Sequence, residues 1–334
     1  MTQTATTTLL ERTRPNVIHH VCSAIAQYGP DINATLNSIE ARPVTRARVA
    51  RDQLQIAFWN AERGYSPEYA AELLDQIDAD ITLLSELDHG VGRTGQRHVS
   101  RDIAQQLKAG HLYAVEFVEM DAREMGELGL HGNAIISHVE MSSPVLVRLA
   151  EDQHWISGHR RARRQGGRIA LGARVKLDDK PIVVVTTHLE SHTSPDTRAL
   201  QMQALLDAID DYAAGDPVLI GGDFNTRTAS KDDLRERVAR QRLSRQCPEL
   251  FTQPQTREPL FDIAARAGYN WTSCNLAVPT ERPRHPGDDT LRFRLDWFFA
   301  RGLICENPGI VIAESETGVA LSDHDIITLS IRLP

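Results

Sequence analysis

The chain has 334 residues, of which 41% are hydrophobic and 25% are charged, with a net charge of −8 and a pI near 5.9. These values are typical of a globular protein with one large domain or two modest ones. The acidic balance argues against a protein that holds duplex nucleic acid by bulk charge, because dedicated nucleic-acid modules are usually strongly basic.

Neither a disulfide framework nor a membrane segment is expected. The four cysteines are scattered and form no CxxC pair, so a zinc cage is not expected either. The N-terminal residues contain no apolar run of signal-peptide length, and no segment approaches the ~20 apolar residues that span a bilayer. We therefore expect a cytoplasmic protein without membrane contact.

Residues 1–50 differ in pattern from the rest. Helical spacing of apolar residues covers 17–28 and 32–41, with Pro30 between the two segments and Pro43 after the second. We interpret this region as a helical N-terminal extension that precedes a main domain at 51–334. Packing on that domain is a better explanation of its apolar residues than contact with a partner.

From residue 51 onward, strands predominate and helices are few. Ser194 and Pro195 open one helix as cap and first-turn residue. Many strands with few helices predict an α/β fold in which two mixed sheets pack face to face with helices outside. The predicted helices are 67–77 and 195–213, and the predicted strands are 54–59, 80–85, 113–118, 133–137, 168–177, 182–187, 217–221, 295–300, 310–313 and 326–333.

Three short polar stretches lie at or near strand ends, far apart in the sequence. They are Thr187-His188-Leu189-Glu190, Gly221-Gly222-Asp223-Phe224-Asn225 and Ser322-Asp323-His324-Asp325. Side chains at strand ends can converge on a ligand at the rim of a sheet. Carboxylates, amides and imidazoles converging there are what phosphate-ester hydrolysis through a divalent metal requires.

Glu86 is the best candidate for a metal carboxylate, because it directly follows the strand that ends at Ser85. Asn60 ends the preceding strand with a neutral oxygen, and Glu62 follows two residues later. Such oxygen ligands suit Mg²⁺ or Mn²⁺. Taken alone, Glu86 would be better explained as an ordinary surface acid at a strand end.

Asp223 and Asn225 point to the same side, because residues two apart in an extended chain do so. Asp223 could accept a proton from water while the Asn225 amide donates to a phosphoryl oxygen. The preceding glycines allow backbone and substrate to approach closely. A Gly-Asp turn at a strand end is common, so this motif needs the others beside it.

His324 could donate to a phosphoryl oxygen or protonate a leaving group. Asp296 is the candidate carboxylate that would orient it, and His188 would supply a second donor to the phosphate. For any one of the 13 histidines a structural role is more common. The hypothesis therefore depends on these strand-end contexts occurring together.

Taken in order from Leu54 to Leu333, these motifs resemble the endonuclease/exonuclease/phosphatase superfamily. That superfamily includes abasic-site endonucleases, pancreatic-type deoxyribonucleases, neutral sphingomyelinases and inositol-phosphate phosphatases. The resemblance implies a four-layer α/β/β/α sandwich with a divalent-metal site at one edge of the packed sheets. The residues that carry it are Asn60, Glu62, Glu86, His188, Asp223, Asn225, Asp296, Asp323 and His324.

The resemblance also implies roles for these residues. Asn60, Glu86 and Asp323 would surround the metal, and Asp223 would handle the nucleophilic water. Asn225 and His188 would contact the phosphate, and His324, paired with Asp296, would stabilise its developing charge. Asn133 lies in a Gly-Asn-Ala strand like that of the family, and Arg168 would reach the phosphate.

The chain departs from the family at two places. Glu62 stands where abasic endonucleases usually carry aspartate, so we place it with the substrate-binding residues. The mid-chain tyrosine of those nucleases has no counterpart here.

The loop after Glu86 supplies Arg93, Arg97 and His98, which could grip a second phosphate or an acidic substituent. A flexible connection with solvated charges explains this loop equally well. Arginines at 160–164 could extend a basic rim or track a nucleic-acid backbone, but aromatic residues for stacking on single strands are few, at 5% of the chain.

We expect a metal-dependent phosphodiesterase or phosphatase that acts on a compact phosphate ester. A DNA or RNA nuclease is the alternative, with duplex DNA disfavoured. A catalytically silent binding module is less well supported, because Glu86, Asp223, Asn225 and His324 are all present. The sequence leaves the oligomeric state open.

Overall fold

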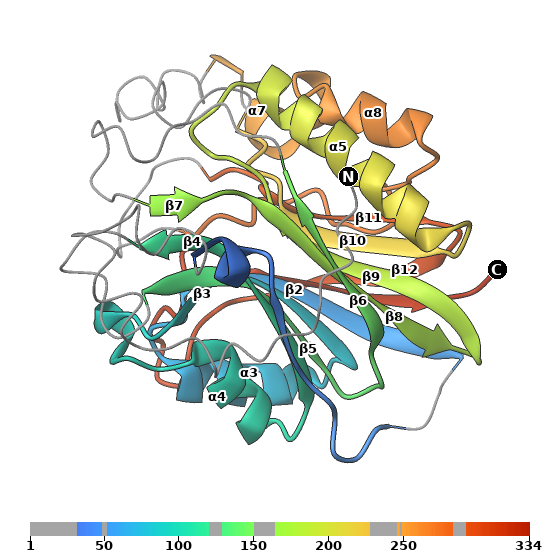
Figure 1. The fold of residues 1–334 in the computed structure, drawn as a ribbon. Coiled ribbons are helices and arrows are strands. Elements are labelled where there is room, and N and C mark those ends of the chain that lie inside the picture. The colour runs from blue at the N-terminus through green and yellow to red at the C-terminus, as the bar shows by residue number, and fades with distance from the viewer. Residues whose placement is uncertain are drawn as a thin grey trace.

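The computed structural model describes residues 32–48, 52–119, 129–149, 164–227, 246–247, 249–282 and 292–334. Two mixed β-sheets pack face to face, and helices cover the outer side of each sheet, which gives four layers (Figure 1). The predicted fold class is confirmed.

The larger sheet has eight strands in the order β1-β4-β5-β3-β2-β13-β12, with β7 paired to β4. Its strands are β1 (Ile39–Arg42), β2 (Gln53–Arg63), β3 (Ile81–His89), β4 (Gly110–Glu119), β5 (Leu130–Ser137), β7 (Arg164–Gly166), β12 (Ile304–Val311) and β13 (Ile326–Arg332). The smaller sheet has five strands in the order β11-β10-β9-β8-β6. These are β6 (Ser142–Arg148), β8 (Ile169–Leu177), β9 (Lys180–His188), β10 (Val218–Asp223) and β11 (Asp296–Arg301).

The helices lie in two groups. α3 (Pro67–Ile77) and α4 (Val99–Gln106) cover the larger sheet, while α5 (Pro195–Ala213) and α8 (Leu260–Arg266) cover the smaller one (Figure 1). The shorter elements are α7 (Glu249–Thr252), η2 (Gly92–Thr94) and η3 (Pro254–Thr256). The Ser194 side chain accepts a hydrogen bond from the Thr197 amide and Pro195 is the first residue of α5, as the sequence predicts.

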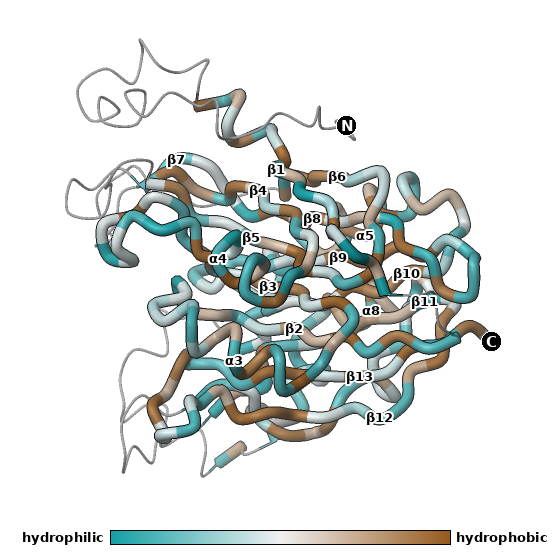
Figure 2. The backbone as a smooth tube through the Cα atoms, turned by 90° about the horizontal axis from the view of Figure 1, so that it is seen from below, coloured by the Kyte–Doolittle hydropathy of each residue, from teal (hydrophilic) through white to brown (hydrophobic). Residues whose placement is uncertain are grey.

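Continuous apolar strands explain why one hydrophobic core lies between the two sheets and another lies between each sheet and its helices. In β9, Ile182 and Val184 face the other sheet, whereas Val183 and Val185 face α5. Successive side chains of a strand point to opposite faces, so a strand buried on both faces is apolar throughout. Figure 2 shows the same molecule from below, with hydrophobic stretches along the strands and α3 and α4 over the larger sheet.

Two parallel strand pairs place their carboxyl ends at one edge of the sandwich. β2 and β3 are parallel and connected through α3, and β9 and β10 are parallel and connected through α5. Asp223 is in register with His188 on β9 and with Asp296 on β11. A Cβ on Gly222 would lie 2.6 Å from the Thr187 carbonyl oxygen, so close packing of β9 against β10 here requires glycine.

One prediction for the N-terminal region was wrong. The segment 32–41 is helical only over 32–36, and Ile39–Arg42 form β1, which pairs antiparallel with β4. Pairing with the free edge of β4 outweighs the helical spacing, because Ile39 is buried in the core between the sheets. The predicted helix 17–28 lies outside the described residues, and the division of the chain at residue 50 stays a prediction.

Of the arginines at 160–164, Arg164 is the first residue of β7 and the others lie outside the described residues. Within the described part of the chain, no helix is both long enough and apolar enough to cross a membrane.

Candidate active site

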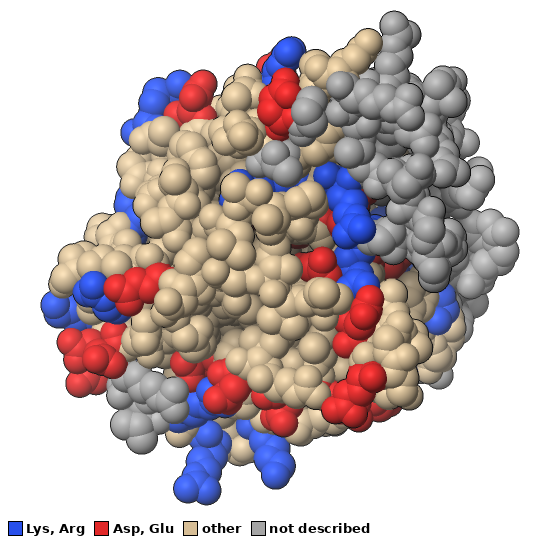
Figure 3. Space-filling model, turned by 180° about the vertical axis from the view of Figure 1, so that it is seen from behind, with Lys and Arg blue, Asp and Glu red and all other residues tan. Residues whose placement is uncertain are grey.

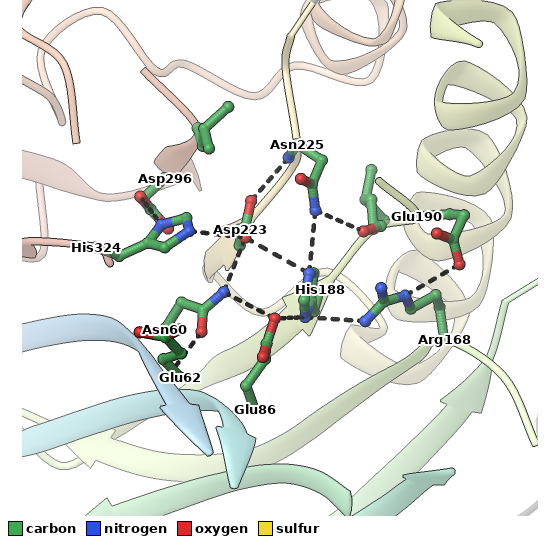
Figure 4. Close-up of polar contacts among 12 residues, drawn as sticks. Asn60, Glu62, Glu86, Arg168, His188, Glu190, Asp223, Asn225, Asp296 and His324 are labelled. Carbon is green, nitrogen blue, oxygen red and sulfur yellow. Dashed lines mark hydrogen bonds and ion pairs between the residues drawn. The ribbon is translucent and has the colours of Figure 1, made fainter. Parts of the chain in front are cut away.

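Polar residues from both sheets meet at the edge defined by the parallel strand ends (Figure 4). The larger sheet contributes Asn60 from β2, Glu86 from β3 and His324 from the turn before β13. The smaller sheet contributes His188 from β9, Asp223 from β10 and Asp296 from β11. Residues separated by more than 260 positions in the sequence thus share one cluster. The predicted catalytic and metal-binding residues are brought together here.

Asp223 lies at the centre of this cluster. Its Oδ2 accepts a hydrogen bond from Asn60 Nδ2 at 2.9 Å and lies 3.5 Å from His188 Nε2 and 3.7 Å from His324 Nε2. Burial raises the pKa of Asp223, with the charge of His324 acting in the opposite direction. A carboxylate with a raised pKa is a better proton acceptor near neutral pH.

His324 is held in its charged form by carboxylates. Its Nδ1 lies 2.8 Å from Asp296 Oδ2, while Nε2 faces Asp223. Burial lowers the pKa of His324, but the charges of Asp296 and Asp223 outweigh it and raise the pKa to about 10. The imidazolium therefore has a proton on Nε2 to donate at neutral pH.

His188 is neutral, in contrast to His324. Burial, together with the charges of Arg168 and His324, places its pKa well below the ordinary value. Arg168 donates from Nη1 to His188 Nδ1 at 3.0 Å, and His188 Nε2 lies 3.0 Å from Asn225 Nδ2 and 3.5 Å from Asp223 Oδ2. Glu116 and Glu190 lie 3.3 and 3.4 Å from Arg168 and balance its charge.

Two site residues have backbone conformations that L-residues rarely adopt. Glu86 has φ 58° and lies where β3 loses register with β2 and β5, and Asn225 has φ 48°. Asn225 is fixed by its amide N–H to Asp223 Oδ1 at 2.9 Å and by Nδ2 to the Leu189 carbonyl at 3.0 Å. Conformations of this kind persist where surrounding contacts enforce them, often at functional sites.

The donor set beside Glu86 fits a hard divalent cation. Glu86 and Asp323 offer carboxylates. Asn60 lies beside Glu86, and its Nδ2 donates to Glu86 Oε1 at 3.3 Å. The side chains of Glu86 and Asp323 are 19% and 18% exposed, whereas that of Asp223 is 2% exposed. The open side of the cluster is therefore its oxygen-rich side, as an ion that also binds substrate would need.

A second possible metal set, Asp223, Asp296 and His324, has ligand atoms within 4.8 Å of one another. A cationic imidazole does not coordinate a metal. Because His324 is held protonated, we interpret this set as an acid with two carboxylate partners.

Four of the predicted substrate-binding residues lie at the margin of the cluster or outside it. Glu62 accepts a hydrogen bond from the Asp323 amide at 3.0 Å, so it supports the metal side. Asn133 contacts Glu116 at 3.3 Å. Arg93 forms a two-point ion pair with Asp88, at 2.7 and 2.8 Å, and also contacts Glu119.

Arg97 ion-pairs with Asp102 at 2.6 Å and with Glu68 on α3. The arginines of the loop after Glu86 are therefore occupied by neighbouring acids of the protein. Their role in substrate binding stays a prediction.

The sequence did not single out the charged residues that surround the site. Arg63 ion-pairs with Glu86, and its Nη1 lies 3.2 Å from His131 Nε2. Burial and the charges of Arg164 and Arg93 lower the pKa of Arg63 to about 10. Glu190 belongs to the same polar motif as His188, and that motif was the available signal for it. Glu116 lies within the fully buried strand β4, where the sequence gave no such signal.

Comparison with known proteins agrees with this geometry. The model of the Endonuclease/Exonuclease/phosphatase family matches residues 57–324. The chain belongs to this family. Family members are generally metal-dependent hydrolases of phosphate esters or nucleic acids. Curated proteins gave no match.

Solved structures are similar in fold. An endonuclease/exonuclease/phosphatase from Beutenbergia cavernae is 17% identical, with a TM-score of 0.59, over 84% of this chain and 72% of that one. The human Nocturnin catalytic domain with bound sulfate is 16% identical, with a TM-score of 0.55, over 84% and 94%. Zebrafish (D. rerio) TDP2 with a single-strand DNA product is 16% identical, with a TM-score of 0.51, over 84% and 98%.

Proposed function

We propose that the protein hydrolyses a compact phosphate ester, as a phosphodiesterase or phosphatase, with Mg²⁺ or Mn²⁺ held at Glu86, Asn60 and Asp323. The observation that carries this proposal is the position of buried Asp223 between neutral His188 and cationic His324. The Asp223 carboxylate can accept a proton, while N–H groups of His188 and His324 face the same space. That combination serves direct attack of water on phosphorus.

In this mechanism, Asp223 accepts a proton from the attacking water, whose oxygen forms the new bond to phosphorus. The ester P–O bond breaks, and the leaving group departs with the bonding electrons. His324 Nε2 and His188 Nε2 donate to phosphoryl oxygens and stabilise the developing charge, and Asn225 holds Asp223 through its backbone amide. A bound divalent ion would neutralise phosphate charge.

Surface charge favours a compact ester over a long nucleic acid. On the described part of the face in Figure 3, basic and acidic side chains are interspersed and form no broad basic surface. Arg164, the described member of the arginine run 160–164 that the sequence offered for backbone binding, pairs with Glu119 at 2.9 Å. The similarity to a TDP2 structure with a single-strand DNA product makes a nuclease the alternative to test.

Hydrolysis of bis-p-nitrophenyl phosphate and p-nitrophenyl phosphate tests the proposal. We expect turnover of one or both with Mg²⁺ or Mn²⁺, loss of turnover after exhaustive chelation, and recovery on adding the metal back. Undiminished turnover after chelation would overturn the metal assignment. A lack of turnover on both esters, together with cleavage of single-stranded DNA or RNA that falls steeply with salt, would favour the nuclease.

A further inference from the structure

A second buried cluster lies on the opposite face of the larger sheet, beneath α4. It consists of Glu40 on β1, His89 at the end of β3, His98 directly before α4 and His111 on β4. We call these four residues the Glu40 cluster. All four are buried, with exposed fractions between 0% and 7%. His111 lies two residues from Tyr113, which packs in the core under α3 and α4, so the cluster faces away from the active site.

The cluster has the dimensions of a metal site. Ligand atoms of Glu40, His89 and His98 all lie within 4.8 Å of one another. His98 Nε2 is 2.9 Å from Glu40 Oε2, and His111 Nε2 is 3.6 Å from Glu40 Oε1. Ligand atoms bound at about 2.0–2.1 Å to a tetrahedral zinc ion lie about 3.3 Å from one another. The rings of His89 and His98 stack with their centroids 3.7 Å apart and 23° between their planes, so one of the two rings must turn for both to face the same ion.

Several buried nitrogens in this cluster have no hydrogen-bond partner. They are Nδ1 of His89 and both ring nitrogens of His111. An unsatisfied buried polar group costs about 1–3 kcal/mol, and native proteins rarely leave several together. The nitrogen lone pairs of such rings are what a cation would use.

We propose that Glu40, His89, His98 and His111 bind a transition-metal ion such as Zn²⁺, separate from the ion of the active site. Three imidazoles and one carboxylate suit Zn²⁺, whereas the oxygen donors beside Glu86 suit Mg²⁺ or Mn²⁺. The two sites would thus select different metals through donor chemistry alone.

Neighbouring residues support the ligands in the way seen around metal sites. Arg101 donates to Glu40 Oε1 at 2.7 Å and leaves Oε2 facing His98. Ser100 Oγ lies 3.3 Å from His98 Nδ1. Such outer contacts fix the orientation of a ligand. Burial lowers the pKa values of His89 and His111, to about 2 and about 3, so both rings are in the neutral form that metals bind.

Such an ion would tie together four segments that already lie side by side. β1, the end of β3, the start of α4 and β4 each contribute one ligand. All four ligands are protein side chains, which is typical of a structural rather than a catalytic ion. We therefore expect the ion to stabilise the fold and to leave the chemistry of the ester substrate unchanged.

The test measures metal content and Co²⁺ absorption in a protein whose two active-site metal carboxylates are removed by Glu86→Gln and Asp323→Asn. In this background we expect about one equivalent of tightly bound Zn²⁺ by mass spectrometry, and visible absorption of tetrahedral intensity after exchange for Co²⁺. Adding His89→Gln with His111→Gln should abolish both signals. The matched control is His138→Gln, since His138 directly follows β5 and lies outside both clusters.

Absence of bound Zn²⁺ and of Co²⁺ absorption in the background protein would overturn the proposal. So would unchanged metal content in the folded His89→Gln, His111→Gln variant. Circular dichroism checks folding, and if that variant does not fold, the Co²⁺ titration of the background protein still decides. Because the active-site ligands are absent, failure here is distinguishable from failure of the proposed phosphoesterase function.

Discussion

Two buried clusters of carboxylates and imidazoles lie on opposite faces of the larger sheet, and one histidine of the active site, His324, differs in charge from the histidines of the other cluster. In the active site, His324 faces Asp296 and Asp223, and the pKa of His324 is raised to about 10. In the Glu40 cluster, three histidines share one carboxylate, which Arg101 also contacts, and burial keeps their pKa values low.

Burial alone does not determine whether these imidazoles are charged. Both clusters are buried, and desolvation lowers the pKa of each of these histidines. A buried imidazole keeps its proton only where the carboxylates around it outnumber the basic groups around it. The ratio of carboxylates to imidazoles thus separates a proton donor from a set of neutral ligands on the two faces of one sheet.

The largest expected effect is from Asp223→Asn, which removes the proton acceptor and keeps the shape. We expect kcat to fall by about 10³-fold, within the range for loss of a general base. The measurement is metal-dependent hydrolysis of bis-p-nitrophenyl phosphate. Asp207→Asn, at an exposed position on α5 that contacts Gln203, is the matched control. Wild-type turnover in Asp223→Asn would remove Asp223 from the mechanism.

On the other face, Glu40→Gln should lower the free energy of unfolding by about 3 kcal/mol. Removing one member of a buried ion pair leaves the partner's charge uncompensated, and Arg101 would lose its carboxylate. Urea denaturation measures the effect, with the exposed Glu72→Gln on α3 as control. A change below about 0.5 kcal/mol, typical of surface substitutions, would show that Glu40 does not hold this cluster together.

The same contrast explains which residues could be predicted from the sequence. The active-site residues were identifiable because each lies at a strand end in a short polar motif, and parallel strands bring such ends together. Helices α3 and α5 were predicted with their observed bounds, 67–77 and 195–213, since proline, capping residues and apolar periodicity agree in them.

The Glu40 cluster gave no such signal. Its members lie in four unrelated segments without a motif, and Glu40 falls in a segment with helical spacing that forms β1 instead. β1 and the edge strand β6 depend on pairing with a distant strand rather than on local pattern. Likewise, the pairing of Arg93 with Asp88 and of Arg97 with Glu68 depends on tertiary contacts that spacing does not reveal.

A smaller effect is expected from Asp296→Asn, which takes away one of the acids that hold the proton on His324. We expect kcat/KM at pH 7 to fall by about 10-fold to 10²-fold, as for a weakened donor to the developing charge. The alkaline limb of the pH profile should move to lower pH, because the pKa of His324 falls toward its ordinary value. The exposed Asp262→Asn on α8 is the control. An unmoved alkaline limb would mean that His324 does not limit activity there.

The smallest expected effect concerns stability, and it separates the charge of His324 from catalysis. The pKa of His324 is raised from 6.5 to about 10 in the folded protein, so its stabilisation is complete below pH 6.5 and is lost as pH rises through about 10. Between pH 7 and pH 10, the free energy of unfolding should therefore fall more in wild type than in His324→Asn. Urea denaturation in EDTA at several pH values gives this difference. Parallel curves for the two proteins would show that His324 is not charged in the fold, and the contrast between the two clusters would then disappear.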